Sequence, residues 1–116
     1  MIQKEQFQTL NNLVYDIYRA KSEEEKFLDV SIFTDTANGN IVIYVNLNER
    51  PKGGYRFRFG LTKDSSDEEI NKAIDLLSVC KEAISYSLKT DGRKSFEEVQ
   101  RRKMKEFTER ILSYFQ

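Results

Sequence analysis

The fold is decided by residues 28–47, LDVSIFTDTANGNIVIYVNL, which alternate apolar with other side chains on both sides of a turn signal. Val30 and Ile32 share one face of the first run, and the second run repeats this period of two. Between the runs, Asn38-Gly39 favours the positive φ angles of a tight hairpin turn. The stretch therefore predicts two antiparallel strands with a common apolar face.

A two-residue turn at Asn38-Gly39 also sets the expected register. Counting outward from that turn places Ile32 opposite Val45 and Thr34 opposite Ile43. Every apolar pair then lies on one face, whereas a slip of one residue would move each of these side chains to the other face.

A third strand is expected after a connection at residues 48–54. Residues 55–59, YRFRF, continue the alternation and carry their aromatic rings on the apolar face. The register that joins the apolar sets places Tyr44 opposite Arg58. We therefore expect an antiparallel meander with the second strand in the middle.

An amphipathic helix is expected before the strands, over residues 3–21. Apolar residues recur there three or four positions apart, which is the period of a helix with one buried face. The expected stripe consists of Phe7, Leu10, Val14 and Ile17, widened by Leu13 and Tyr18.

Two capping boxes predict two further helices. In a capping box, a Ser and a Glu three positions later satisfy each other's free backbone amides. The pairs lie at residues 66 and 69 and at residues 95 and 98, so we expect helices over residues 67–89 and 96–116. The predicted fold class is α+β in the order α-β-β-β-α-α. We expect a single domain over residues 1–116, with helices packed on the apolar face of the meander and the last two helices forming a hairpin.

Composition narrows the classes of function. The chain has 116 residues, 19 basic against 19 acidic, with no His and one Cys. It therefore lacks the commonest general base and transition-metal ligand, and we expect no enzymatic activity, no cofactor and no metal. Cys80 lies on the inward stripe of its helix, which favours an inert buried thiol. Neither a signal peptide nor a membrane span is visible, so we expect a cytoplasmic protein without a membrane partner.

The second face of the sheet is the candidate site for a protein partner. It presents aromatic rings and arginines, which are the residues preferred at interface hot spots. The alternative is that a helix covers this face and the arginines stack on Tyr44 as a structural cation–π pair. The predicted partner-binding residues are Phe33, Tyr44, Arg56 and Arg58 on the strands and Lys52 in the connection at residues 48–54.

Charge is segregated along the chain although it sums to zero. Two basic zones, at residues 50–63 and 93–105, alternate with acidic stretches. Zones of this kind that meet in space would bind a phosphate backbone. The candidate nucleic-acid-binding residues are Arg50, Lys52, Arg93, Lys94, Arg101, Arg102 and Lys105.

The order of elements resembles the layout of some small phage-encoded inhibitors of bacterial defence nucleases, without a shared motif. This resemblance implies a phage or mobile-element accessory protein that acts on a host protein. We predict a non-catalytic protein-binding module or inhibitor that uses the open sheet face and the loop at residues 48–54. The alternatives are a nucleic-acid-binding protein and a homo-oligomeric structural protein such as a homodimer.

Overall fold

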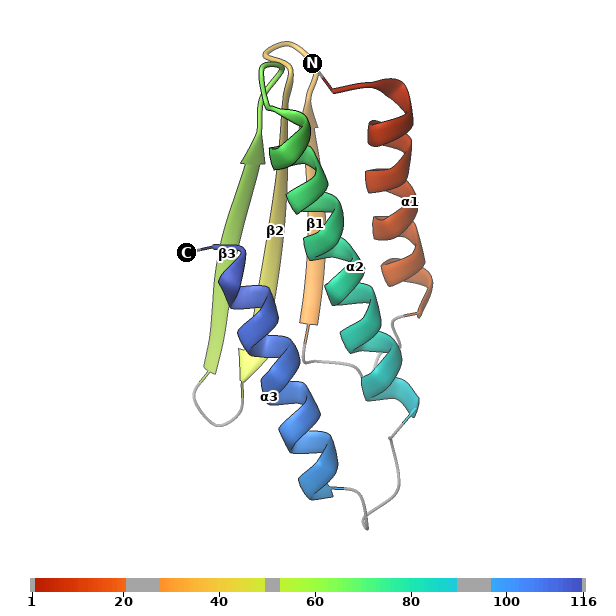
Figure 1. Cartoon of the computed structure of the whole chain (residues 1–116), viewed down its shortest axis with the longest axis vertical. Coiled ribbons are helices and arrows are strands. Elements are labelled where there is room, and N and C mark those ends of the chain that lie inside the picture. The colour runs from red at the N-terminus through yellow and green to blue at the C-terminus, as the bar shows by residue number, and fades with distance from the viewer. Residues whose placement is uncertain (1, 21–27, 50–52, 90–96, 116) are drawn as a thin grey trace.

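The computed structural model describes residues 2–20, 28–49, 53–89 and 97–115. The elements are, in chain order, α1 (Lys4–Ala20), β1 (Leu28–Asp35), β2 (Asn40–Glu49), β3 (Gly53–Leu61), α2 (Asp67–Lys89) and α3 (Glu97–Ser113). The strands form one antiparallel sheet in the order β1-β2-β3, and the three helices lie on one side of it (Figure 1). The predicted α+β class and its α-β-β-β-α-α order are confirmed.

The sheet face toward the helices is apolar. Alternate residues of the central strand β2 are 3% exposed or less, as the period of two requires: Ile41, Ile43, Val45 and Leu47. On β3, Phe57 and Phe59 continue this face and are half-buried. Phe115, just after α3, stacks on Phe57 with 4.9 Å between ring centroids and meets Phe59 edge-on at 6.3 Å. The end of the chain therefore covers the apolar side of β3.

The predicted register is confirmed for one pair of strands and wrong for the other. Tyr44 pairs with Arg58 across β2 and β3, as expected. Across β1 and β2, however, Ile32 pairs with Ile43, two residues away from the predicted Val45. An error of two residues leaves every side chain on its predicted face, because side chains alternate with that same period.

The register differs because the β1–β2 loop has four residues, 36–39, between the paired residues Asp35 and Asn40. The Asp35 carboxylate accepts hydrogen bonds from the Asn38 backbone nitrogen at 3.3 Å and from Asn38 Nδ2 at 2.7 Å. These bonds hold a wider turn than the two-residue type that Asn-Gly favours. Gly39 still supplies the positive φ, at 69°.

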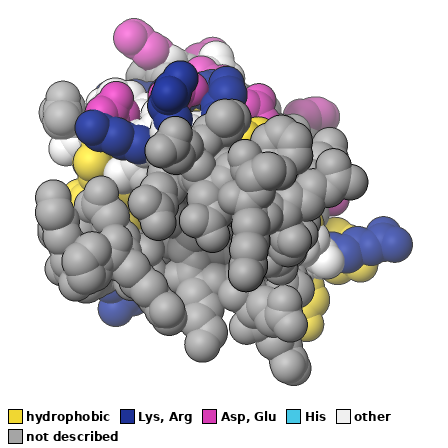
Figure 2. All heavy atoms as spheres, turned by 90° about the horizontal axis from the view of Figure 1, so that it is seen from below, with side chains coloured by type: hydrophobic (Ala, Val, Ile, Leu, Met, Phe, Trp, Pro, Cys, Tyr) yellow, Lys and Arg dark blue, Asp and Glu magenta, His cyan; other side chains and the backbone are white. Residues whose placement is uncertain are grey.

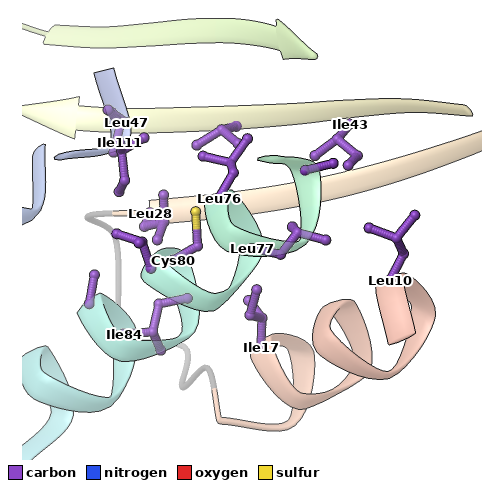
Figure 3. Close-up of a cluster of buried hydrophobic side chains, with 14 of the residues drawn as sticks. Leu10, Ile17, Leu28, Ile43, Leu47, Leu76, Leu77, Cys80, Ile84 and Ile111 are labelled. Atoms are coloured by element: carbon purple, nitrogen blue, oxygen red, sulfur yellow. The ribbon is translucent and has the colours of Figure 1, made fainter. Parts of the chain in front are cut away.

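Helix α2 is the centre of the helix layer. Its first turn shows one of the two bonds of the predicted capping box: the Glu69 backbone nitrogen donates to Ser66 Oγ at 3.2 Å. The Glu69 carboxylate instead accepts a bond from the Ser66 hydroxyl, at 3.4 Å, in place of the predicted bond from the Ser66 backbone nitrogen. More of its surface is buried than one stripe, because the sheet, α1 and α3 all pack against it (Figure 3). Among the described side chains of α2, the buried ones are Ile70, Ala73, Leu76, Leu77, Val79, Cys80, Ala83 and Ile84.

The flanking helices are tied to α2 at its exposed side. Lys81 Nζ lies 3.0 Å from the Asp16 carboxylate of α1, and Arg110 of α3 lies 3.5 Å from Glu82. Helices α2 and α3 run antiparallel to each other, as expected for a hairpin (Figure 1). On α1 the predicted stripe is correct except at Tyr18, which is 78% exposed because it falls on the solvent side of the helix. The capping box predicted at residues 95 and 98 lies outside what the structure describes.

Candidate protein-binding face

One face of the sheet is not covered by any helix in the described part of the chain. We call it the outer sheet face; it consists of the residues that alternate with the buried set, namely Asp29, Ser31, Phe33, Asp35, Asn40, Val42, Tyr44, Asn46, Arg56, Arg58 and Gly60. The helices all pack on the opposite face (Figure 1). The structure therefore brings four of the five predicted partner-binding residues together on one surface.

Tyr44 is the centre of the outer sheet face. The guanidinium carbon of Arg56 lies 4.1 Å from the centroid of its ring, and the Phe33 ring meets it edge-on at 5.6 Å with an interplanar angle of 81°. Each contact contributes about 0.5–1 kcal/mol at an exposed site. The predicted cation–π pair with Tyr44 thus exists, but without the covering helix that the alternative interpretation required.

Phe33 is the most exposed apolar ring of this surface, with 57% of its area open to solvent. Its neighbour Tyr44 is only partly exposed, while Arg56 and Arg58 are exposed. Because Phe33 and Arg56 both already contact the Tyr44 ring, a partner would immobilise few additional rotamers of these side chains on binding. This arrangement is a preformed surface rather than a set of independent side chains.

Arg58 is directed along its own strand. One terminal guanidinium nitrogen lies 3.5 Å from the point that a Cβ on Gly60 would occupy. Gly60 has no side chain that would displace this guanidinium from the sheet. The β3 side of the outer sheet face therefore ends in a flat, positively charged plane.

Negative charge lies at the other edge of the same surface. Asp29 and Asp35 are exposed residues of β1. Two hydrogen bonds from Asn38 lower the pKa of Asp35 below its ordinary value. The bond from the Asn38 side chain has the larger effect, and the bond from its backbone has the smaller. The outer sheet face thus carries carboxylates along β1 and guanidinium groups along β3.

The predicted loop at residues 48–54 is shorter in the structure. Pairing of β2 with β3 continues to Glu49 and Gly53, so four of the seven residues belong to strands. Glycine at residues 53 and 54 does not end the ladder, because the hairpin register continues through them. Lys52 and Arg50 lie outside the described residues.

The two basic zones are not brought onto one surface within the described residues. Arg56 and Arg58 belong to the outer sheet face, whereas α3, with exposed Arg102 and Lys105, packs on the opposite face. On the side seen in Figure 2, described basic side chains occupy separate places and mix with acidic ones along one border. Arg93 and Lys94 lie outside the described residues, and so does the side chain of Arg101.

The helix layer has a groove on its surface. This open groove, of about 520 Å³, has walls from all three helices, at Leu13, Tyr86 and Phe107. Its two charged lining residues, Lys81 and Glu82, are both engaged in the ion pairs with α1 and α3. Sequence analysis did not find this groove, because its walls depend on how three helices pack together.

Within the described residues, no group of three or more His, Cys, Asp or Glu side chains is placed to hold a metal ion. None of the described helices is both long enough and apolar enough to cross a membrane. Comparison of the chain with protein-family models, with curated proteins and with solved structures gives no significant match.

Proposed function

We propose that this chain is a non-catalytic protein-binding module whose partner docks on the outer sheet face. The observation that carries the proposal is the contiguous cluster of Phe33, Tyr44 and Arg56 on a surface without a covering helix in the described chain. Aromatic and arginine side chains dominate the binding energy of protein interfaces. A ring that is 57% exposed, as in Phe33, gains most from burial by a partner.

The surface favours a partner of a particular chemistry. Arg56 and Arg58 are exposed guanidinium groups, and each presents a fork of donors that matches a carboxylate. Phe33 needs an apolar or aromatic surface beside those carboxylates. The proposed partner is therefore a protein that presents acidic side chains next to an apolar patch.

Inhibition is the specific form of this proposal that the sequence layout favours, as in an accessory protein of a phage or mobile element acting on a host protein. A module that covers a partner's working surface needs no chemistry of its own. Nucleic-acid binding is less well supported, because Arg56 and Arg58 lie on the face of the sheet opposite to α3 and its basic residues.

The test is capture of partners from the native host's lysate with three immobilised proteins. These are the wild type, a Tyr44→Ala variant that also carries Arg58→Ala, and a Tyr18→Ala control whose ring is 78% exposed on α1. We expect a nuclease-resistant protein on the wild type and on the control, reduced about tenfold or more on the double variant. Far-ultraviolet circular dichroism should be unchanged, and the melting temperature should fall by no more than about 5–10 °C, which is the effect of losing the two ring contacts of Tyr44.

Equal capture by all three proteins would overturn the proposal, because binding would then not use the outer sheet face. Loss of capture after nuclease treatment would also overturn it and favour a nucleic-acid partner. A fall in melting temperature beyond that range would make the two residues structural. In that case Arg58→Glu alone, on an exposed side chain, replaces the double variant.

A further inference from the structure

We infer that a second copy of this chain binds the outer sheet face, in a face-to-face dimer whose two-fold axis runs parallel to β2. The inference rests on the proposed function, because it names a partner for the same surface. Asp29, at one edge of this surface, supplies the acidic group that Arg56, at the other edge, requires. The apolar ring that a partner needs is supplied by Phe33.

The strand registers arrange these groups in rows. Three rows cross the outer sheet face at successive heights: Asp29, Asn46 and Arg56; Ser31, Tyr44 and Arg58; and Phe33, Val42 and Gly60. The β1 end of these rows contains a carboxylate and an aromatic ring, and the β3 end contains two guanidinium groups and a glycine. If one row is turned end to end and laid over the same row of a second copy, the acidic or aromatic residue of β1 therefore lies over the basic residue or glycine of β3.

Charge selects the direction of the axis. A two-fold axis parallel to the strands places β1 of one copy over β3 of the other and keeps every row at its own height. An axis perpendicular to the strands within the interface places β3 over β3, which brings the arginines of the two copies together. Like charges in a desolvated interface are strongly unfavourable, so the parallel axis is favoured.

The parallel axis brings groups of opposite charge from the two copies together, in addition to the contacts that each group makes within its own chain. Asp29 of one copy faces Arg56 of the other copy. Phe33 faces Gly60, where the Arg58 guanidinium lies flat and offers its plane to the ring. Tyr44 lies near the axis and faces Tyr44 of the other copy.

Sheet twist does not destroy these pairings. Stacked sheets cross at about 30°, and residues of the two outer rows lie about 4.8 Å across and about 7 Å along the strands from Tyr44, so they shift by roughly 4 Å. Neighbouring side chains on the same face of a strand are about 7 Å apart. The shift is smaller than that spacing, so each row keeps its partner row.

The size of the surface sets the expected affinity. Three strands of eight residues cover roughly 14 Å by 26 Å, or about 360 Å² a face, so pairing two such faces buries on the order of 700–1,000 Å². This area is below that of stable interfaces and typical of weak, transient ones. We therefore expect a reversible dimer with a dissociation constant on the order of micromolar to tens of micromolar.

Charge exchange tests the inference by sedimentation equilibrium from about 1 to 500 µM, a range that brackets the expected dissociation constant. Asp29→Arg and Arg56→Asp each place like charges opposite each other, so each variant alone should dimerise about tenfold or more weakly than the wild type. An equimolar mixture of the two should recover dimers, because every introduced charge then faces its complement. A chain carrying both substitutions should recover them for the same reason.

A wild type that remains monomeric up to the highest concentration would overturn the inference. So would single variants that dimerise like the wild type, or a mixture that stays monomeric. If either single variant is unfolded by circular dichroism, Phe33→Arg, at an exposed ring, places a like charge over Arg58 and should weaken dimerisation similarly. Capture of a different protein that depends on Tyr44 would keep the proposed function even if the dimer failed.

Discussion

At the residue scale, Gly39 combines two requirements that no other side chain meets. Its φ is 69°, and a Cβ at this position would overlap the methylene groups of Lys63. The backbone conformation therefore favours glycine, and any other residue would also displace the exposed Lys63 side chain. We expect Gly39→Ala to lower the free energy of unfolding by about 1–2 kcal/mol, measured by urea denaturation.

Gly60 provides the matched control for Gly39. Its φ is not in the positive range, and a Cβ there would make only ordinary contact with the Arg58 guanidinium, at 3.5 Å. Gly60→Ala should change the unfolding free energy by about 0.5 kcal/mol or less. If the two substitutions had equal effects, the argument from conformation and space at Gly39 would fail.

Cys80 is fully buried in the core, on the side of α2 that the sequence predicted. Burial raises the pKa of its thiol from 9.0 to about 12. The native thiol therefore stays protonated at pH values where the unfolded chain loses its proton. By linkage, the stability that this difference contributes is complete below pH 9 and is lost as the pH rises from 9 toward 12.

The measurement is urea denaturation of the wild type and of Cys80→Ala between pH 7 and about 10.5. The upper part of this pH range covers the titration of a thiol in the unfolded chain. The difference in unfolding free energy between the two proteins should be constant up to about pH 8.5 and then shift against the wild type. A difference that stayed constant to the highest pH would contradict the raised pKa. At pH 8 the native thiol should also resist a thiol reagent that labels the unfolded chain at once.

At the element scale, the N-terminus of α2 depends on the capping box of Ser66 and Glu69. Removal of the hydroxyl by Ser66→Ala leaves a backbone amide of the first turn without its acceptor. We expect a loss of about 1 kcal/mol in unfolding free energy, measured by denaturation. Thr9→Ala, an exposed substitution within α1, should change it by about 0.5 kcal/mol or less; an equal loss there would show that the cap has no special role.

The element boundaries were predictable wherever the signal is local. The capping box placed the start of α2 correctly, and the predicted limits at residues 67 and 89 agree with the structure. Strand faces were predictable because alternation depends only on the neighbouring residues. The β1–β2 register was not, because the bonds between Asp35 and Asn38 select a four-residue loop that the Asn-Gly pair alone does not indicate.

The candidate site was predictable in its members but not in its setting. Alternation places Tyr44 and Arg58 on one face whatever covers that face. Whether a helix lies over it depends on the packing of three helices, which is a long-range property. The length of the β2–β3 connection was overestimated, because the glycines at residues 53 and 54 remain paired in the ladder.

At the scale of the whole molecule, the two layers have opposite surface characters. The helix layer presents mixed charges with ion pairs such as Lys103 with Glu106, at 3.5 Å. The outer sheet face instead has rings at its centre, carboxylates along one edge and guanidinium groups along the other. A molecule with a formal net charge of zero thus carries a locally polarised surface on its outer sheet face.

This distribution predicts weak binding to single-stranded nucleic acid, with only a modest dependence on salt. The outer sheet face offers two arginines, Arg56 and Arg58, and two phosphate contacts predict that affinity falls less than about tenfold between 50 and 200 mM salt. Zones that converged on six or more phosphates would instead lose about a hundredfold or more. Fluorescence anisotropy with a labelled oligonucleotide distinguishes the two cases. Micromolar binding at low salt that falls steeply with added salt, and that Arg102→Ala with Lys105→Ala weakens, would contradict the separation of the basic residues onto opposite layers.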